Sequence, residues 1–146
     1  MRILGIDYGE KRIGLAISDE TQTFSREIGI LSPKEFWKQV YRILQENEVT
    51  KIVLGWPLNM SGEETKKTKE VESFKLKVES KTGLPVEIMD ERLTSVMAVH
   101  LRQGFGGLPS KNNKKVGKTL PAKNEYVDSL AAQILLQNYL DKSKKN

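Results

Sequence analysis

Residues 2–19 read RILGIDYGEKRIGLAISD, and this stretch contains two short apolar segments joined by a turn. The segments are residues 2–7 and 12–18, and both are rich in isoleucine and leucine, a composition that suits a pleated, half-buried surface. The residues between them include Gly9, and a glycine in such a short connection is typical of a hairpin. The sequence therefore predicts an opening antiparallel hairpin whose first strand ends at Asp7.

Three further segments have the composition of strands. Residues 24–31 carry isoleucine at alternate positions and can add a third strand to the hairpin. Residues 52–54 form a continuous apolar run, which is typical of a parallel strand buried on both faces. Residues 84–89 form the last predicted strand, and Asp90 and Glu91 follow it directly.

Helix signals separate these strands. The sequence SPKE at 32–35 combines a capping box with proline at the first helical position. SGEE at 61–64 is a second capping box, for a helix that is predicted to stop at Gly83. Thr94 is predicted to cap a helix over residues 96–101, and Asn124 to cap the last helix. The side chains expected on the buried helix faces are Phe36, Val40, Ile43, Leu44, Val71, Phe74, Val78, Val127, Ala131, Ile134 and Leu135.

The predicted order of elements is β-β-β-α-β-α-β-α-α. A three-stranded meander followed by alternating strands and helices predicts an α/β fold with a five-stranded mixed sheet and helices on both faces. No internal repeat or linker suggests a second domain, so we expect a single domain over residues 1–140. Residues 141–146 are expected to form a frayed basic tail.

Composition excludes several classes of chemistry. The 146 residues include no cysteine and one histidine, which leaves no disulfide, thiolate zinc site or thiol nucleophile. No apolar run approaches the roughly 20 residues of a membrane-spanning helix. The net charge of +5 is modest. We therefore expect a cytoplasmic protein, without a membrane partner, whose chemistry comes from carboxylates, hydroxyls, lysines and arginines.

The positive charge is concentrated in one part of the chain, because no acidic residue occurs between Glu91 and Glu125. Residues 104–118 are rich in glycine, asparagine and lysine and show neither helical nor strand periodicity, which predicts a mobile loop. One interpretation is a solvated loop that serves solubility. The other is an arm that follows the phosphates of a nucleic acid.

Carboxylates follow two of the predicted strands, and a third begins the last helix. Functional residues of open α/β sheets gather at the carboxyl ends of parallel strands, and Asp7 and Glu91 fall there. The first turn of the last helix, which carries Asp128, could approach the same edge. Three carboxylates at one place would repel one another unless they held a divalent cation. Oxygen ligands without thiolates select Mg²⁺ or Mn²⁺.

Each of these carboxylates also has a structural interpretation. Asp7 could be a turn aspartate. Glu91 could pair on the surface with Arg92 or Lys51, and Asp128 could favour its helix through the helix dipole. Similarly, Trp56 beside the predicted edge could stack a base or pack against the sheet.

Four sequence blocks, in order, resemble the YqgF (RuvX) family, which is described as pre-16S rRNA nucleases with a ribonuclease H-like fold, related to Holliday junction resolvases. The first block is GIDYGEKRIGLAISD at 5–19. The others are VLGWPLNMSG at 53–62, DERLTS at 90–95 and VDSLAA at 127–132. The similarity covers residues 2 to about 140. Tyr8 and Trp56 depart from the residues that the family more often has at these positions.

The resemblance implies a ribonuclease H-like core and assigns the catalytic and metal-binding roles to Asp7, Glu91 and Asp128. It also implies Mg²⁺ or Mn²⁺ as cofactor and trimming of the 5′ end of small-subunit ribosomal RNA. Lys11, Asn59 and Arg92 are expected to hold phosphate or sugar oxygens. The basic loop is expected to grip the RNA backbone through Lys111, Lys114, Lys115 and Lys118.

Two alternative functions remain open from the sequence. A resolvase of four-way DNA junctions would need two active sites and therefore a dimer, and no dimer stripe is evident, so we expect a monomer or a weak dimer. A non-catalytic RNA-binding factor in ribosome assembly would need only the basic loop. The leading hypothesis is a metal-dependent endonuclease acting on structured RNA of the pre-ribosome.

Overall fold

The structure, a computed structural model, describes residues 1–56, 66–90 and 123–145, with side chains in the last range from 130 to 144. Its elements are strands β1 (Arg2–Tyr8), β2 (Ile13–Ser18), β3 (Ser25–Leu31), β4 (Val49–Trp56) and β5 (Val86–Asp90), with helices α1 (Pro33–Glu46), α2 (Lys66–Thr82) and α4 (Lys123–Lys145). None of the helices in these ranges is both long and apolar enough to cross a membrane.

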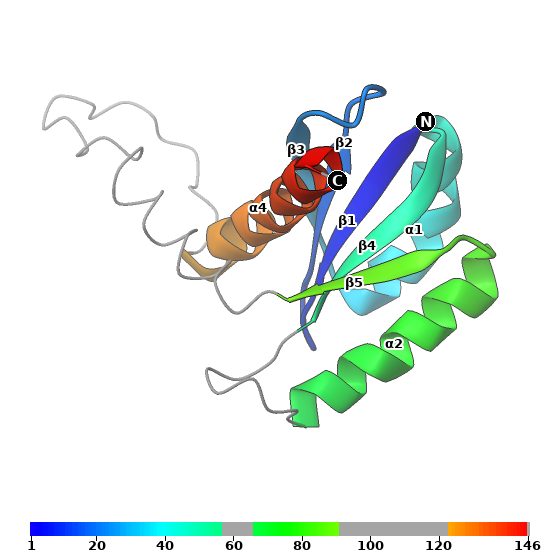
Figure 1. Cartoon of the computed structure of the whole chain (residues 1–146). Coiled ribbons are helices and arrows are strands. Elements are labelled where there is room, and N and C mark those ends of the chain that lie inside the picture. The colour runs from blue at the N-terminus through cyan, green and yellow to red at the C-terminus, as the bar shows by residue number, and fades with distance from the viewer. Residues whose placement is uncertain (57–65, 91–122, 146) are drawn as a thin grey trace, which may run out of the picture.

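The five strands form one mixed sheet in the order β3-β2-β1-β4-β5 (Figure 1). Strand β1 pairs antiparallel with β2 and parallel with β4, and β4 pairs parallel with β5. The predicted meander and the predicted parallel half are both confirmed, and they meet at β1. This strand is central, so the residue at its carboxyl end has neighbouring strands on both sides.

Helices cover both faces of the sheet, as the sequence predicts (Figure 1). On one face α1 and α2 bury their apolar stripes in the larger core, which includes Phe36, Val71 and Phe74. On the other face α4 buries Ala132 and Leu136 in a second core with strand residues such as Val53. The continuous apolar run in β4 is therefore explained, since its alternate residues enter different cores.

The sequence signals for α1 and α2 are confirmed where the structure describes them. The Ser32 hydroxyl accepts a hydrogen bond from the Glu35 backbone N–H, and the Glu35 carboxylate accepts one from the Ser32 N–H. Helix α2 ends at Thr82, and Gly83 follows with a φ of +69°, a conformation that favours glycine. The second capping box at 61–64 and the helix predicted over 96–101 lie outside the described residues.

Several predicted boundaries are wrong by one or more residues. Strand β3 begins at Ser25 and not at Phe24, because the Phe24 backbone N–H donates to the Asp19 carboxylate. Helix α4 begins at Lys123, so Asn124 lies within its first turn and does not precede it. Residues 52–54 are only the middle of β4, which extends from Val49 to Trp56.

The expected frayed tail is also wrong for residues 141–145, which are the last turns of α4. Here the Lys144 ammonium donates to the Thr23 hydroxyl, and the Gln137 amide donates to the Asp141 carboxylate. The tail remains helical because these contacts, one of them to the loop before β3, add to the helix's own backbone hydrogen bonds.

Candidate functional site

Asp7 lies near the carboxyl end of the central strand and faces helix α4. It is half-buried, and it pairs with Gly14 in the antiparallel ladder, so it is a strand residue rather than a turn aspartate. Side chains alternate along a strand. Ile3 joins the core under α4, whereas Leu4 and Ile6 join the core under α1 and α2. Odd-numbered positions of β1, including Asp7, therefore belong to the α4 face.

The turn after Asp7 is tight, and it requires the glycine that the sequence places there. A Cβ atom on Gly9 would lie 2.5 Å from the Arg12 carbonyl oxygen, a distance that real side chains do not adopt. Lys11, the predicted phosphate-binding residue of this turn, is exposed. The hairpin therefore holds an exposed cation four residues after Asp7.

The carboxyl ends of three parallel strands meet at the edge where Asp7 lies. Ile6 is level with Leu54, and Leu54 is level with Ile88, so β1, β4 and β5 advance together towards this edge. Asp90 is the last residue of β5 and is level with Trp56. Adjacent strands are about 4.8 Å apart, which puts the ends of β1 and β5 roughly 10 Å from each other.

Helix α4 runs antiparallel to β1, so its N-terminal end is directed towards the same edge (Figure 1). Gly5 of β1 lies against Ala132 and Leu136 near the middle of the helix. Towards the other end of the sheet, Tyr139 contacts Lys51 near the start of β4. Asp128 belongs to α4 and precedes Ala132 by one helical turn, while its side chain lies outside the described part of the structure.

Most of the other predicted site residues lie outside the described residues. They are Asn59, Glu91, Arg92, Lys111, Lys114, Lys115 and Lys118. Within the described residues no three histidine, aspartate or glutamate side chains form a group that could hold a metal ion. Of the predicted carboxylates, the structure thus locates the side chain of Asp7, the backbone of Asp128 and the strand that leads to Glu91.

Asp19 and Trp56, two weaker candidates, have structural roles. Asp19 follows β2, at the opposite end of the hairpin from Asp7, and its carboxylate accepts hydrogen bonds from the Thr21 hydroxyl and the Thr23 N–H. These hydrogen bonds, of which that from Thr21 has the largest effect, lower the pKa of Asp19 to about 2. Trp56 is half-buried and packs against the core under α1 and α2.

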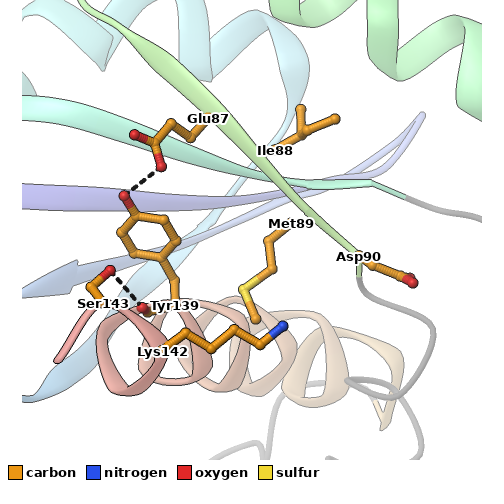
Figure 2. A pocket seen from close by; sticks show the side chains of 7 residues that line it. All are labelled: Glu87, Ile88, Met89, Asp90, Tyr139, Lys142 and Ser143. Atoms are coloured by element: carbon orange, nitrogen blue, oxygen red, sulfur yellow. Dashed lines mark hydrogen bonds between the residues drawn. The ribbon is translucent and has the colours of Figure 1, made fainter. Parts of the chain in front are cut away.

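A polar link between α4 and the sheet was not predicted. The Tyr139 hydroxyl donates to Glu87 at 2.5 Å (Figure 2). The Lys51 ammonium lies 3.1 Å from the same carboxylate. These hydrogen bonds, chiefly that from Tyr139, hold the pKa of Glu87 below its usual value. Lys51, named above as a surface partner for Glu91, therefore pairs with Glu87. No local spacing signals this link, because its members come from three separate elements.

The link borders a pocket of about 360 Å³ between β5 and the C-terminal half of α4. Figure 2 shows Met89 and Lys142 in this pocket, with Asp90 at the end of the strand pointing away from Tyr139. Glu87 and Met89 contact α4, so odd-numbered positions of β5 face this helix, as they do in β1. Glu91 follows Asp90 in the chain and is odd-numbered, as Glu87 and Met89 are.

Known proteins resemble this chain over nearly its whole length. A curated relative from Dictyoglomus thermophilum is 36% identical, with 98% of this chain and 97% of that protein covered. A second, from Chloroflexus aurantiacus, is 35% identical, with 99% and 89% covered. Both carry the name "putative pre-16S rRNA nuclease".

Solved structures share the fold at low sequence identity. RuvC from Thermus thermophilus, in complex with a Holliday junction substrate, matches with a TM-score of 0.58 and 17% identity, covering 100% of this chain and 97% of RuvC. The Holliday junction resolvase of fowlpox virus matches with a TM-score of 0.55 and 16% identity over 97% and 99% of the two chains. The protein therefore shares the fold of these resolvases.

A family model described as "RuvX: Holliday junction resolvase" matches residues 1–142. This match takes in the hairpin that carries Asp7, the three parallel strands and most of α4. Together with relatives that are more than 30% identical over nearly the whole chain, it shows that the protein belongs to the RuvX (YqgF) family.

Proposed function

We propose that this protein is a divalent-metal-dependent endonuclease that processes the 5′ end of pre-16S rRNA in the cytoplasm. Residues 1–140 would form the single nuclease domain. The names of the curated relatives support the substrate, and the family supports the class of reaction. Water would attack a phosphodiester to leave a 5′-phosphate and a 3′-hydroxyl.

The observation that carries this proposal is the position of Asp7. It is a half-buried carboxylate on the central strand, directed to the α4 face at the edge where β1, β4 and β5 end. Ligand sites in open α/β sheets favour this edge. A half-buried carboxylate at such an edge is better suited to binding a cation than a carboxylate that is fully solvated on the surface.

The backbone supports Glu91 and Asp128 as the partners of Asp7. Position 128 precedes Ala132 by one turn, and residues four apart lie on the same side of a helix. From Gly5 to Asp7 the strand advances about 7 Å, and from Ala132 to position 128 the helix advances about 6 Å in the same direction. Because Gly5 lies against Ala132, these advances support a location of position 128 near the level of Asp7. Odd-numbered positions of β5 face α4, which favours Glu91 over Asp90 as a partner of Asp7.

The donor chemistry fits a hard cation. The chain supplies carboxylate oxygens at this edge and has no cysteine that would favour a softer metal. Mg²⁺ or Mn²⁺, when bound, supplies activation of the attacking water and stabilisation of the leaving oxygen. Asp7, Glu91 and Asp128 would together hold the cation.

The cationic side chains would hold the RNA. Lys11 is exposed on the turn next to Asp7, where it can reach a phosphate on either side of the cut bond. We assign the same role to Asn59 and Arg92, which follow β4 and β5 in sequence. Lys111, Lys114, Lys115 and Lys118 would add contacts that are independent of sequence and sensitive to salt.

The test compares Asp7→Asn with a matched carboxamide substitution, Asp90→Asn, at the same edge. Cleavage of a precursor RNA that carries the 5′ leader of 16S rRNA is measured with Mg²⁺ under single-turnover conditions. We expect Asp7→Asn to lose cleavage while its circular dichroism spectrum stays native, and Asp90→Asn to retain most of it. Cleavage by a folded Asp7→Asn protein at the wild-type rate would rule out the proposed role of Asp7.

A second candidate function is the resolution of four-way DNA junctions, which the description of the family model favours. This reaction needs two sites related by a two-fold axis, and hence a dimer. Junction DNA and precursor RNA should be compared side by side with the same preparation, and its mass measured by light scattering. Faster cleavage of the junction by a dimer would favour the resolvase over the RNA nuclease.

A further inference from the structure

A second pocket lies at the same edge of the sheet as Asp7 but on the opposite face. Its volume is about 310 Å³, and it lies between the end of β1, the start of α1 and helix α2. Aromatic rings of Tyr8, Trp37 and Phe74 form its walls, and Glu70, Ser73 and Lys77 lie at its rim. Pockets that combine aromatic walls with a few polar groups are typical of ligand sites.

The aromatic walls expose ring surface to the pocket. Tyr8 and Trp37 are only half-buried, whereas Phe74 behind them is 6% exposed. The ring centroids of Tyr8 and Phe74 are 4.5 Å apart, and those of Trp37 and Phe74 are 5.7 Å apart. The packing against Phe74 fixes the two outer rings, so a flat ligand would meet an ordered surface.

The rim carries one cation and one carboxylate at separate places. The Lys77 ammonium lies 4.6 Å from the centroid of the Trp37 ring, and that of Lys81 lies 4.9 Å from the same centroid, but only Lys77 lines the pocket. Glu70 lines the pocket together with Tyr8, and the pKa of Tyr8 is raised by burial first and then by the carboxylates of Glu70 and Glu10. Tyr8 is therefore a neutral hydrogen-bond donor at physiological pH.

The location connects this pocket with the proposed cleavage site. Tyr8 directly follows Asp7 in β1, and successive side chains of a strand point to opposite faces. The two residues thus share the carboxyl edge while Asp7 faces α4 and Tyr8 faces α2. An unpaired strand that crosses this edge would leave one site and reach the other within one or two nucleotides.

We propose that this pocket binds one unpaired nucleotide of single-stranded RNA, next to the bond that is cut. Its phosphate would hold Lys77, and its base would lie against Tyr8 and take the place of the Lys77 ammonium over the Trp37 ring. Glu70 would accept a hydrogen bond from an exocyclic amino group of the base. The proposal rests on the nuclease function proposed above and adds a specificity site to it.

The residue types favour a nucleotide over simpler ligands. A free inorganic anion would need cations but no aromatic walls, and a purely apolar ligand would need neither Lys77 nor Glu70. Stacking on aromatic rings combined with a backbone-directed cation is the usual means of binding single strands. Paired bases present neither face to such a pocket, so a duplex is excluded. The carboxylate of Glu70 favours cytosine, adenine or guanine over uracil, which has no amino group.

Trp37 provides a direct probe, because the chain has only one other tryptophan, Trp56. The experiment uses the full chain with Trp56→Phe and Asp7→Asn, so that emission comes from Trp37 and the RNA is not cut. Fluorescence is titrated with oligocytidine, oligouridine, an RNA duplex and free CMP. We expect the Kd obtained from quenching of Trp37 fluorescence to be at least fivefold lower for oligocytidine than for oligouridine. CMP should bind more weakly than either oligonucleotide. The duplex should not change the fluorescence of Trp37.

Three substitutions on the exposed or half-buried surface of α2 test the assignment. Lys77→Ala should weaken binding of oligocytidine at least fivefold and reduce the slope of log K against log salt by about 0.7, the value for one phosphate contact to a single strand. Lys81→Ala is the matched control and should change neither. Glu70→Gln should abolish the preference for cytidine while leaving the salt slope unchanged.

Equal effects of Lys77→Ala and Lys81→Ala would overturn the proposal, as would an unquenched Trp37 in the presence of oligocytidine. A Kd for CMP as low as that for oligocytidine would also overturn the proposal and would favour a free nucleotide as the ligand. These readouts do not depend on cleavage, because Asp7→Asn is present throughout. If wild-type protein fails to cleave RNA but Trp37 is quenched as expected, the nuclease function fails and the nucleotide pocket stands.

Discussion

Gly5 of β1 lies directly against Leu136 of α4: a Cβ atom on Gly5 would be 2.9 Å from the Leu136 Cβ. Leu136 is fully buried, and its Cβ cannot move by a change of rotamer. The absence of a side chain at Gly5 therefore lets α4 approach the strand that carries Asp7. The distance between the helix and Asp7 depends on this contact.

We predict that Gly5→Ala separates α4 from β1 and impairs both stability and cleavage. Overpacking of this kind costs about 1–3 kcal/mol of the free energy of unfolding, which urea denaturation measures. Cleavage should fall further than stability explains at a temperature where the protein is fully folded, because position 128 moves with the helix. Leu136→Gly in the same chain removes the Cβ atom that clashes and should restore part of the cleavage, whereas Leu136→Ala keeps that atom and should not. A double variant no better than the sum of the single ones would contradict this account.

The sequence predicted the elements well because their signals are local. The hairpin of β1 and β2 follows from apolar segments around Gly9, and α1 follows from its capping box at Ser32 and Glu35. These signals depend on residues only a few positions apart. Element boundaries were less accurate, since hydrogen bonds from outside the element decide them, as the Asp19 carboxylate does for the start of β3.

The site could be predicted only in part. Asp7 is a candidate because it lies near a strand end, and the parallel register of β1, β4 and β5 confirms that these strand ends share an edge. The contact of Tyr139 with Glu87, by contrast, joins residues 52 positions apart. Nothing in the spacing of either residue indicates its partner, because the contact depends on how α4 crosses the sheet.

Ser18 supports the start of the central strand from within the core. The residue is 2% exposed, and its hydroxyl accepts a hydrogen bond from the Ile3 N–H at 2.9 Å and donates to the Asp19 carbonyl at 3.0 Å. We predict that Ser18→Ala lowers the free energy of unfolding by about 1–3 kcal/mol, since it leaves the buried Ile3 N–H unpaired. Urea denaturation measures the loss. Ser143→Ala, which removes a hydroxyl from the exposed end of α4, is the control and should change stability far less.

Asp19 should make stability depend on pH in the acid range. The Thr21 hydroxyl, with the N–H groups of Phe24 and Thr23, lowers its folded-state pKa to about 2 from an ordinary value of 3.8. A lowered folded pKa contributes stability that is present above the unfolded pKa and is lost as pH falls from about 4 towards 2. We predict that Asp19→Asn flattens this part of the profile of unfolding free energy against pH, and that a carbon-detected NMR titration gives Asp19 a pKa near 2. An Asp19 that titrates at its ordinary value would contradict the prediction.

We predict that Asp7 destabilises the protein without a divalent cation and stabilises it when the cation is bound. In the proposed site, Asp7, Glu91 and Asp128 repel one another without the cation, and Asp7→Asn removes one of these charges, so the variant should melt at a higher temperature than the wild type in EDTA. With Mg²⁺ the wild type should gain stability by ligand binding, about 2.7 kcal/mol at a concentration one hundred times the Kd, while the variant gains less. The melting temperatures of the two proteins should therefore cross as Mg²⁺ is added. Asp90→Asn is the control, and its melting temperature should rise with Mg²⁺ as the wild type's does. Parallel curves for Asp7→Asn and the wild type would show that Asp7 does not bind the cation, since a carboxylate that holds the ion cannot be replaced by an amide without loss of affinity.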